Sequence, residues 1–341
     1  MIKSYKHQVF IVIGILLSLF LFTSNPLQLD DKAAAVLAIA FLVIFLWITE
    51  AIPMAAAALL PLVLFPLLDI MPVKDVAKSY GDPIIFLFMG GFFLGLAIEK
   101  WNFHKRIALK ILSKVGHSPS TILLGVMLSS FLISNWISNT ATTMMLFSAV
   151  FALIQETKEH ITGKSKKFGA ALLLGLAFSA TIGGMATPVG TPPNMYFFKA
   201  FKEAFPLESN LNFFKWSLIG YPIASVFLFL TYVILNWYFI KNKCQLIIGK
   251  NYFKENYKKL GKFTYEEKWV FALFVMCILL WFTRADIEFG SINFKGWNHF
   301  FVNPKYIDDS LVAILAALIL FLVPSKQNKN ESLLVWEDAR S

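Results

Sequence analysis

The sequence predicts an all-α polytopic membrane protein, and three observations support this fold class. Hydrophobic residues make up 57% of the 341 residues and charged residues only 15%, against about 25% charged in a soluble domain. Several stretches approach the roughly 20 apolar residues that a helix needs to cross a bilayer. The basic residues behind the net charge of +10 fall between these stretches, as in cytoplasmic loops, so we expect no nucleic-acid partner.

Apolar runs predict the membrane spans in chain order. The first run, 8–24, is interpreted as a retained helix rather than a signal peptide, because no small-residue cleavage pattern follows it. The further predicted spans lie near 33–51, 53–70, 83–100, 168–198, 213–240, 266–283 and 309–324. One more apolar stretch, 119–154, is long enough for two short helices.

Lysines and arginines predict the orientation of the chain through the positive-inside rule. Lys3 and Lys6 place the N-terminus in the cytoplasm. One basic segment, 105–114, precedes the stretch 119–154, and a second, 158–167, follows it. Because both flanks are then cytoplasmic, the stretch must enter and leave the membrane on the same side. It is therefore predicted to form a re-entrant hairpin.

Polar residues lie at the centre of this predicted hairpin. Ser138, Asn139 and Thr140 interrupt the apolar stretch, and Ser134 and Asn135 lie one helical turn earlier. The bilayer interior offers no water to these side chains, so they must face protein, a cavity or an ion. Hydrogen bonding between helices would explain a lone serine. Five hydroxyl or amide side chains within seven residues indicate a binding site instead.

A second irregular element lies in the predicted span 168–198. Residues 183–194 read Gly-Gly-Met-Ala-Thr-Pro-Val-Gly-Thr-Pro-Pro-Asn. Prolines remove backbone donors and clash with the preceding turn, and glycines permit unwound backbone, so a continuous helix cannot run through. A kink without function is the alternative, since Pro and Gly are common in membrane helices. A hairpin tip beside a broken helix is the pattern of a transporter binding site.

The chemistry at such a site would be oxygen-rich and uncharged. The stretches 119–154 and 168–198 contain no Asp, Glu, Lys or Arg. Hydroxyl, amide and freed carbonyl oxygens suit a hard cation such as Na⁺. Helix N-termini and hydroxyls suit a carboxylate or sulfate. We therefore expect coupled binding, in which Na⁺ supplies the positive charge that the anion needs.

These residues resemble the divalent-anion:sodium symporter family, the sodium-coupled sulfate, dicarboxylate and citrate transporters. The matching segments are Thr49–Pro53, Phe88–Phe92, Trp101–Arg106, Ser138–Thr140 and Gly190–Asn194. The resemblance covers nearly the whole chain. It implies an elevator mechanism, in which a transport domain slides against a scaffold that forms a homodimer.

The resemblance also implies roles for individual residues. By the family's pattern, one sodium ion is held by Ser134, Ser138, Asn139 and Gly190. The substrate carboxylate is contacted by Asn139 and Thr140, with Thr191 and Pro192 near it. Some family members have glycine where Pro192 stands. Na⁺ is the implied coupling ion, and no organic cofactor is expected. The expected partners are membrane lipid and a small divalent anion, which is a C4-dicarboxylate, sulfate or citrate.

Weak internal echoes predict an inverted-repeat architecture. Leu46–Glu50 is echoed by Leu280–Arg284, and Asp75–Ser79 by Glu337–Ser341. In this register a second hairpin and a second broken helix would follow Ser341. The second repeat is therefore predicted to be incomplete and the chain to be a C-terminally truncated carrier.

The predicted domain organisation has four parts. Residues 1–115 form scaffold helices. Residues 116–240 form half of a transport domain, which comprises the hairpin 119–154, the broken helix 168–198 and the helix 213–240. Residues 241–265 form a basic cytoplasmic linker, which is interpreted as a topology determinant lying against anionic headgroups, with an amphipathic surface helix as the alternative. Residues 266–341 begin the second repeat with scaffold helices.

Three other functions are weighed against a carrier in a bacterial inner membrane. A membrane enzyme is disfavoured because the histidines show no metal-ligand spacing and no Ser-His-Asp arrangement accompanies them; they are His7, His104, His117, His160 and His299. A non-transporting membrane scaffold or receptor fragment would leave the hairpin tip and the broken helix unexplained. An anion exchanger not driven by sodium could share the architecture.

Overall fold

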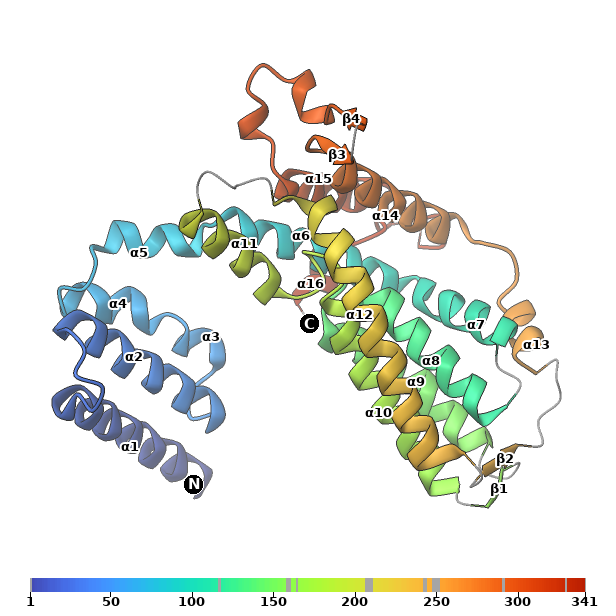
Figure 1. Ribbon diagram of the computed structural model, residues 1–341, viewed down its shortest axis with the longest axis horizontal. Coiled ribbons are helices and arrows are strands. Elements are labelled where there is room, and N and C mark those ends of the chain that lie inside the picture. The colour runs from blue at the N-terminus through green and yellow to red at the C-terminus, as the bar shows by residue number, and fades with distance from the viewer. Residues whose placement is uncertain are drawn as a thin grey trace. The chain divides into compact units, whose positions relative to one another are not determined.

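The computed structural model describes residues 2–115, 118–157, 161–163, 165–205, 211–241, 244–246, 252–289, 292–328 and 330–340. The described chain is almost entirely helical and divides into two compact units, Met1–Ile85 and Phe86–Ser341 (Figure 1). Five of its helices are long and apolar enough to cross a membrane, which confirms the predicted fold class. Lys158, Lys164, His117, His160 and Ser341, used in the predictions above, lie outside the described ranges.

The first unit contains five helices. They are α1 (Ile2–Ser24), α2 (Asp31–Ile48), α3 (Met54–Ala57), α4 (Leu60–Leu67) and α5 (Val73–Tyr80). Helix α1 packs along α2, where a Cβ on Gly14 would lie 2.8 Å from the Phe45 ring. The single span predicted at 53–70 is wrong, because the structure has two shorter helices there. Pro61, near the start of α4, lacks the N–H that a continuous helix would need.

The second unit is built mainly from helices, and the first of them begins three residues before the unit boundary at Phe86. They are α6 (Pro83–Lys100), α7 (Phe103–Val115), α8 (Pro119–Ser134), α9 (Asn139–Thr157), α10 (Ser165–Gly184), α11 (Pro192–Ala204), α12 (Phe213–Leu235), α13 (Tyr252–Lys259), α14 (Tyr265–Thr283), α15 (Asp309–Leu322) and α16 (Trp336–Arg340). A π-helical turn, Asn236–Ile240, extends α12. Two 3₁₀ turns, Trp297–Phe300 and Pro304–Tyr306, precede α15.

Among the described residues of this unit, four short strands form two antiparallel pairs. Strand β1 (Ile161–Gly163) pairs with β2 (Cys244–Leu246), and β3 (Ile287–Phe289) pairs with β4 (Ile292–Phe294). The first pair joins the chain after α9 to the chain after α12, and the second is a local hairpin after α14. The sequence prediction contained neither pair.

Helices α8 and α9 form the predicted pair of short helices over 119–154. Helix α8 begins with a capping box, in which Ser118 and Thr121 each accept a backbone N–H of the other. Helix α10 packs against both α8 and α9, so the three lie side by side (Figure 1). Gly175 allows the close approach of α10 to α8, because a Cβ there would lie 2.7 Å from a Leu123 methyl group.

An aromatic stack covers the end of the α8–α9 pair. The Trp136 ring, in the link between the two helices, stacks on Phe213 of α12 with centroids 6.1 Å apart and on Trp281 of α14 at 6.3 Å. Trp281 donates its indole N–H to the Asp309 carbonyl oxygen at 2.9 Å. These rings hold the link against α12, α14 and the start of α15.

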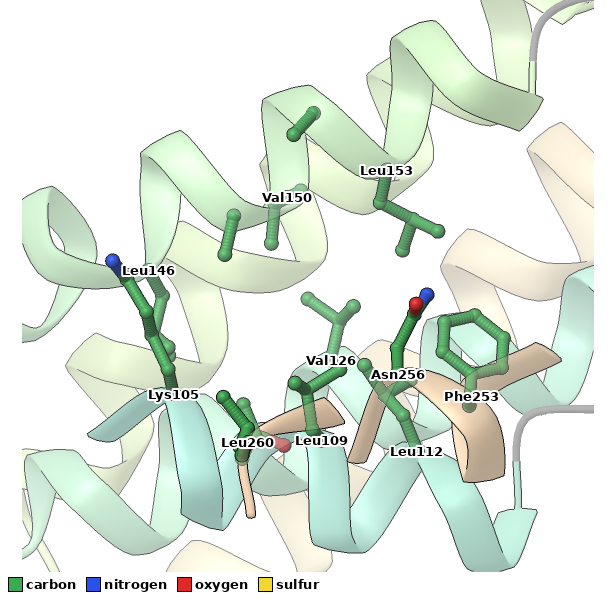
Figure 2. A pocket seen from close by; sticks show the side chains of 14 residues that line it. Lys105, Leu109, Leu112, Val126, Leu146, Val150, Leu153, Phe253, Asn256 and Leu260 are labelled. Atoms are coloured by element: carbon green, nitrogen blue, oxygen red, sulfur yellow. The ribbon is translucent and has the colours of Figure 1, made fainter. Parts of the chain in front are cut away.

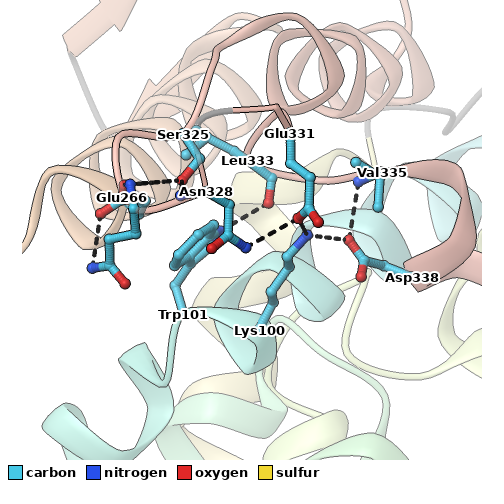
Figure 3. Close-up of polar contacts among 10 residues, drawn as sticks. Lys100, Trp101, Glu266, Ser325, Asn328, Glu331, Leu333, Val335 and Asp338 are labelled. Atoms are coloured by element: carbon cyan, nitrogen blue, oxygen red, sulfur yellow. Dashed lines mark hydrogen bonds and ion pairs between the residues drawn. The ribbon is translucent and has the colours of Figure 1, made fainter.

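Polar contacts tie the end of α6 to the C-terminal segment. The Lys100 ammonium lies 2.7 Å from a carboxylate oxygen of Asp338 and 3.3 Å from one of Glu331. Trp101 donates its indole N–H to the Leu333 carbonyl oxygen at 2.8 Å (Figure 3). Residues 100–101 and 331–338 are therefore held together by both charge and hydrogen bonding.

Candidate functional site

The predicted polar tip is the link between α8 and α9. Helix α8 ends at Ser134 and α9 begins at Asn139. Ser138 precedes α9 and its hydroxyl accepts the Ala141 N–H at 3.3 Å, which is the contact of a helix N-cap. The polar tripeptide therefore serves a local purpose as well, because it starts the second helix. Residues 138–140 therefore lie at the N-terminal end of α9, directly after the link that joins it to α8.

The predicted break lies between α10 and α11. Helix α10 ends at Gly184, and α11 starts with two prolines after an extended Thr191. The carbonyl groups freed by the break are partly satisfied by Asn194, whose side-chain amide donates to the carbonyl oxygens of Gly184 at 2.8 Å and Thr187 at 2.7 Å. Asn194 is buried, so its amide satisfies these backbone carbonyl groups in the interior of the protein.

The tip and the break lie against each other. The Thr187 hydroxyl donates to the Asn135 carbonyl oxygen. A Cβ on Gly183 would lie 2.5 Å from the Phe131 carbonyl oxygen, and one on Gly184 would lie 2.3 Å from Oδ1 of Asn139. No side chain larger than hydrogen fits at either glycine with this packing. The two discontinuous elements predicted from sequence therefore form a single locus.

The residues assigned to sodium only partly converge on this locus. Ser134 is fully buried and donates its hydroxyl to Oδ1 of Asn139 at 2.9 Å. Gly190 is buried, and a Cβ there would lie 2.6 Å from the Gly184 carbonyl oxygen, so Gly190 and Asn139 both adjoin Gly184. The fourth residue, Ser138, is exposed at the tip.

The residues assigned to the substrate lie at the margin of the locus. Asn139 and Thr191 are half-buried, and Thr140 and Pro192 are exposed. Asn139 is the first residue of α9 and Pro192 the first residue of α11. Two helix N-termini, each with a partial positive charge, therefore start beside Gly184. Exposed residues at these ends are open to a ligand.

Asn135 is the residue whose importance the sequence prediction missed. It is fully buried. In the amide orientation that satisfies all its neighbours, its NH₂ group donates to the carbonyl oxygens of Gly183 at 2.9 Å and Phe131 at 2.8 Å, and its oxygen accepts the Tyr221 hydroxyl at 3.0 Å. Its position in the polar cluster was a usable signal. No feature of the sequence singled out Tyr221, which is a tyrosine in an apolar span far along the chain.

Helix α12 holds both irregular elements in place. Tyr221 binds the tip through Asn135, and Trp216 donates its indole N–H to the Met185 carbonyl oxygen in the break at 3.1 Å. Gly220, between them, lies so close to the break that a Cβ would be 2.7 Å from the Ala186 carbonyl oxygen. This face of α12 therefore fixes the tip relative to the break.

We expect Tyr221→Phe to destabilise the chain by about 1–3 kcal/mol, because the buried Asn135 oxygen loses its donor. Tyr232→Phe is the matched control: Tyr232 is half-buried on the same helix and makes no hydrogen bond within the described residues. Chemical unfolding in detergent, followed by circular dichroism, measures both. Equal losses of stability from the two substitutions would contradict the role given to the Tyr221 hydroxyl.

The groups at this locus that could bind a cation are uncharged oxygen atoms. Within the part of the chain that the structure describes, no three His, Cys, Asp or Glu side chains come together. His104 is buried and faces the Ile98 carbonyl oxygen, and burial lowers the pKa of its imidazole, so it is a packing residue. Neutral hydroxyl, amide and carbonyl oxygens fit a hard monovalent cation better than a transition metal.

The sequence of this chain is similar to those of known transport proteins. A profile of a family described as citrate transporter matches residues 44–328. The sodium-dependent dicarboxylate transporter SdcS of Staphylococcus saprophyticus is 36% identical over 348 residues, which cover 99% of this chain and 65% of that relative. The SdcS of Staphylococcus aureus strain USA300 is 37% identical over 341 residues, which cover 96% and 63%. The chain thus spans less than two thirds of the length of these relatives. The relatives are named as transporters and not as enzymes, which agrees with the class of protein predicted from the sequence.

Proposed function

We propose, from the premise that this chain belongs to the citrate transporter family, that it provides a sodium and anion site for sodium-coupled uptake of a small divalent anion. The observation that carries the proposal is the position of the Asn139 amide, which accepts the Ser134 hydroxyl at the tip and lies against Gly184 at the break. Two discontinuous helices meeting at uncharged oxygens are the usual form of a coupled binding site in secondary transporters.

In this proposal the cation is bound by Ser134, Ser138, Asn139 and Gly190, and the anion by Asn139, Thr140, Thr191 and Pro192. The N-terminus of α9 supports the anion assignment, because its first N–H groups and its dipole favour a carboxylate. Helix α11 adds only its dipole, since Pro192 and Pro193 at its start have no N–H to donate. Bound Na⁺ adds a positive charge that the stretches 119–154 and 168–198 do not supply, because they contain no Lys or Arg. A C4-dicarboxylate is the first substrate to test, since the two relatives are named as dicarboxylate transporters; citrate and sulfate are the next.

The proposal extends to the setting of this site. The chain would lie in a bacterial inner membrane with its N-terminus in the cytoplasm, and α8–α9 would be a re-entrant hairpin. Residues 116–240 would belong to a mobile transport domain and residues 1–115 and 266–341 to a scaffold that dimerises, as an elevator mechanism requires. Five helices able to cross a membrane support the membrane part of this proposal.

Binding rather than uptake is the sharper test, because the chain spans only 65% of its relative's length. We expect Na⁺ to raise the unfolding temperature of the detergent-solubilised chain above that in choline at equal ionic strength. Succinate should add a further rise in Na⁺ and none in choline. Equal unfolding temperatures in Na⁺ and choline would refute sodium binding, and a succinate effect of the same size in both would favour a carrier not driven by sodium.

A further inference from the structure

A cavity of about 230 Å³, separate from the tip and the break, lies between α7, α8, α9 and α13 (Figure 2). It runs along the part of α8 and α9 that is far from Asn139, since its α9 residues fall between Leu146 and Leu153. Its lining comes from these four helices and from Leu260, which directly follows α13, and most of the lining side chains are aliphatic. None of these residues belongs to the sodium and anion site.

The interior of this cavity is suited to an alkyl chain. Only Lys105, Ser129 and Asn256 among its lining residues carry polar side chains. The Ser129 hydroxyl already donates to the Gly125 carbonyl oxygen at 2.7 Å within its own helix, so it offers no donor to a ligand. A polar solute such as a dicarboxylate would lose its hydration here without replacement, whereas an acyl chain would not.

The rim of the cavity is positively charged. The Lys105 ammonium lies at one end and the Asn256 amide at the other (Figure 2). Lys105 is exposed, and no carboxylate pairs with it among the described residues. Helix α13, which packs on α7, carries exposed Lys254, Lys258 and Lys259 and one exposed carboxylate, Glu255, and none of these four side chains lines the cavity. An apolar interior with a cationic rim complements a molecule that has an alkyl chain and an anionic head.

We propose that this cavity binds an anionic phospholipid, with one acyl chain between α7 and α9 and the phosphate at Lys105. The hydrocarbon of a bilayer is as apolar as the cavity, so an acyl chain gains little by moving from one to the other. Selectivity must therefore come from the headgroup charge. One lysine near an anionic lipid headgroup corresponds to a preference of about fivefold.

The first experiment measures which lipids stay bound to the purified full chain. The chain is equilibrated in mixed micelles with equal amounts of phosphatidylglycerol and phosphatidylcholine, and bound lipid is counted by native mass spectrometry. We expect phosphatidylglycerol to be retained about fivefold over phosphatidylcholine, and Lys105→Gln to remove this preference. Lys114→Gln is the matched control, because Lys114 is exposed on the same helix but does not line the cavity.

The second experiment blocks the cavity. Ala149→Phe places a ring in the space between α9 and α7, whereas Ser148→Phe adds the same ring at the neighbouring exposed position, outside the lining. We expect Ala149→Phe to abolish lipid retention and Ser148→Phe to preserve it, with unchanged helix content in both. Equal retention of the two lipids, equal effects of Lys105→Gln and Lys114→Gln, or full retention in Ala149→Phe would each overturn the proposal. None of these readouts depends on sodium or on transport.

Discussion

Replacing Asn139 with alanine should weaken sodium binding by about 100-fold while leaving the helices intact. Asn139 supplies the amide oxygen that accepts the Ser134 hydroxyl at 2.9 Å and adjoins Gly184 at the break. Alanine removes that oxygen and leaves the buried Ser134 hydroxyl without its partner. Loss of groups that hold or orient a metal ligand typically lowers affinity by about 10- to 100-fold, and Asn139 has both roles in the proposed site.

The sodium dependence of the unfolding temperature, titrated against choline at constant ionic strength, measures this loss. Thr143→Ala is the matched control. Thr143 lies on the same helix and its hydroxyl donates only to the backbone carbonyl oxygen of Asn139, at 2.8 Å. We expect the sodium titration of Thr143→Ala to match that of the unmodified chain. An Asn139→Ala chain with an unchanged sodium midpoint would remove Asn139 from the site.

A second variant displaces the Asn139 amide without deleting it. In Gly184→Ala the new methyl group would lie 2.3 Å from Oδ1 of Asn139, so the amide must move. Gly169→Ala is the control on the same helix, because its Cβ would meet a methyl group of the Ile154 side chain at 3.2 Å, which can adjust. We expect loss of the sodium response in the first variant alone. A normal response in Gly184→Ala would show that the position of the amide does not matter.

The hairpin tip and the helix break could be predicted because their signals are local. Prolines and glycines between 183 and 193 forbid a continuous helix whatever surrounds them. Ser138 is both part of the polar cluster and the N-cap of α9, so the same residues that suggested a site also started a helix. The short helices at 54–57 and 60–67 were missed because hydropathy alone does not record the missing N–H of Pro61.

The contacts that join these elements could not be predicted, because they connect residues far apart in sequence. Asn135 and Tyr221 are 86 positions apart, and neither residue type specifies the other. The same holds for α7, which was assigned to the scaffold 1–115 but packs on α8 of the hairpin. Its basic residues predicted the side of the membrane, not the helix against which they lie. A scaffold boundary at 115 stays a prediction.

Replacing Arg106 with methionine should destabilise the chain by about 3–5 kcal/mol, because it leaves the buried Glu267 carboxylate without its positively charged partner. The Arg106 guanidinium of α7 donates two hydrogen bonds to Glu267 of α14, both 2.8 Å long, and a third to the Gly261 carbonyl oxygen at 3.0 Å. Both side chains are at most 7% exposed. The hydrogen bond that Arg106 donates to Glu267 raises the pKa of the guanidinium, which therefore stays charged at neutral pH.

The double variant Arg106→Met/Glu267→Gln separates the cost of an unpaired charge from the value of the pair. Removing both charges at once should recover most of the stability, because an ion pair and an uncharged pair of similar volume are often equivalent. Lys78→Met is the control: its partner Asp75 is exposed, so we expect a change of about 1 kcal/mol or less. Chemical unfolding in detergent measures the stability of the unmodified chain, Arg106→Met, the double variant and Lys78→Met. A double variant no more stable than Arg106→Met would mean that Arg106 acts through the backbone carbonyls of residues 260–262 and the Phe263 ring, 4.5 Å from its guanidinium carbon, rather than through Glu267.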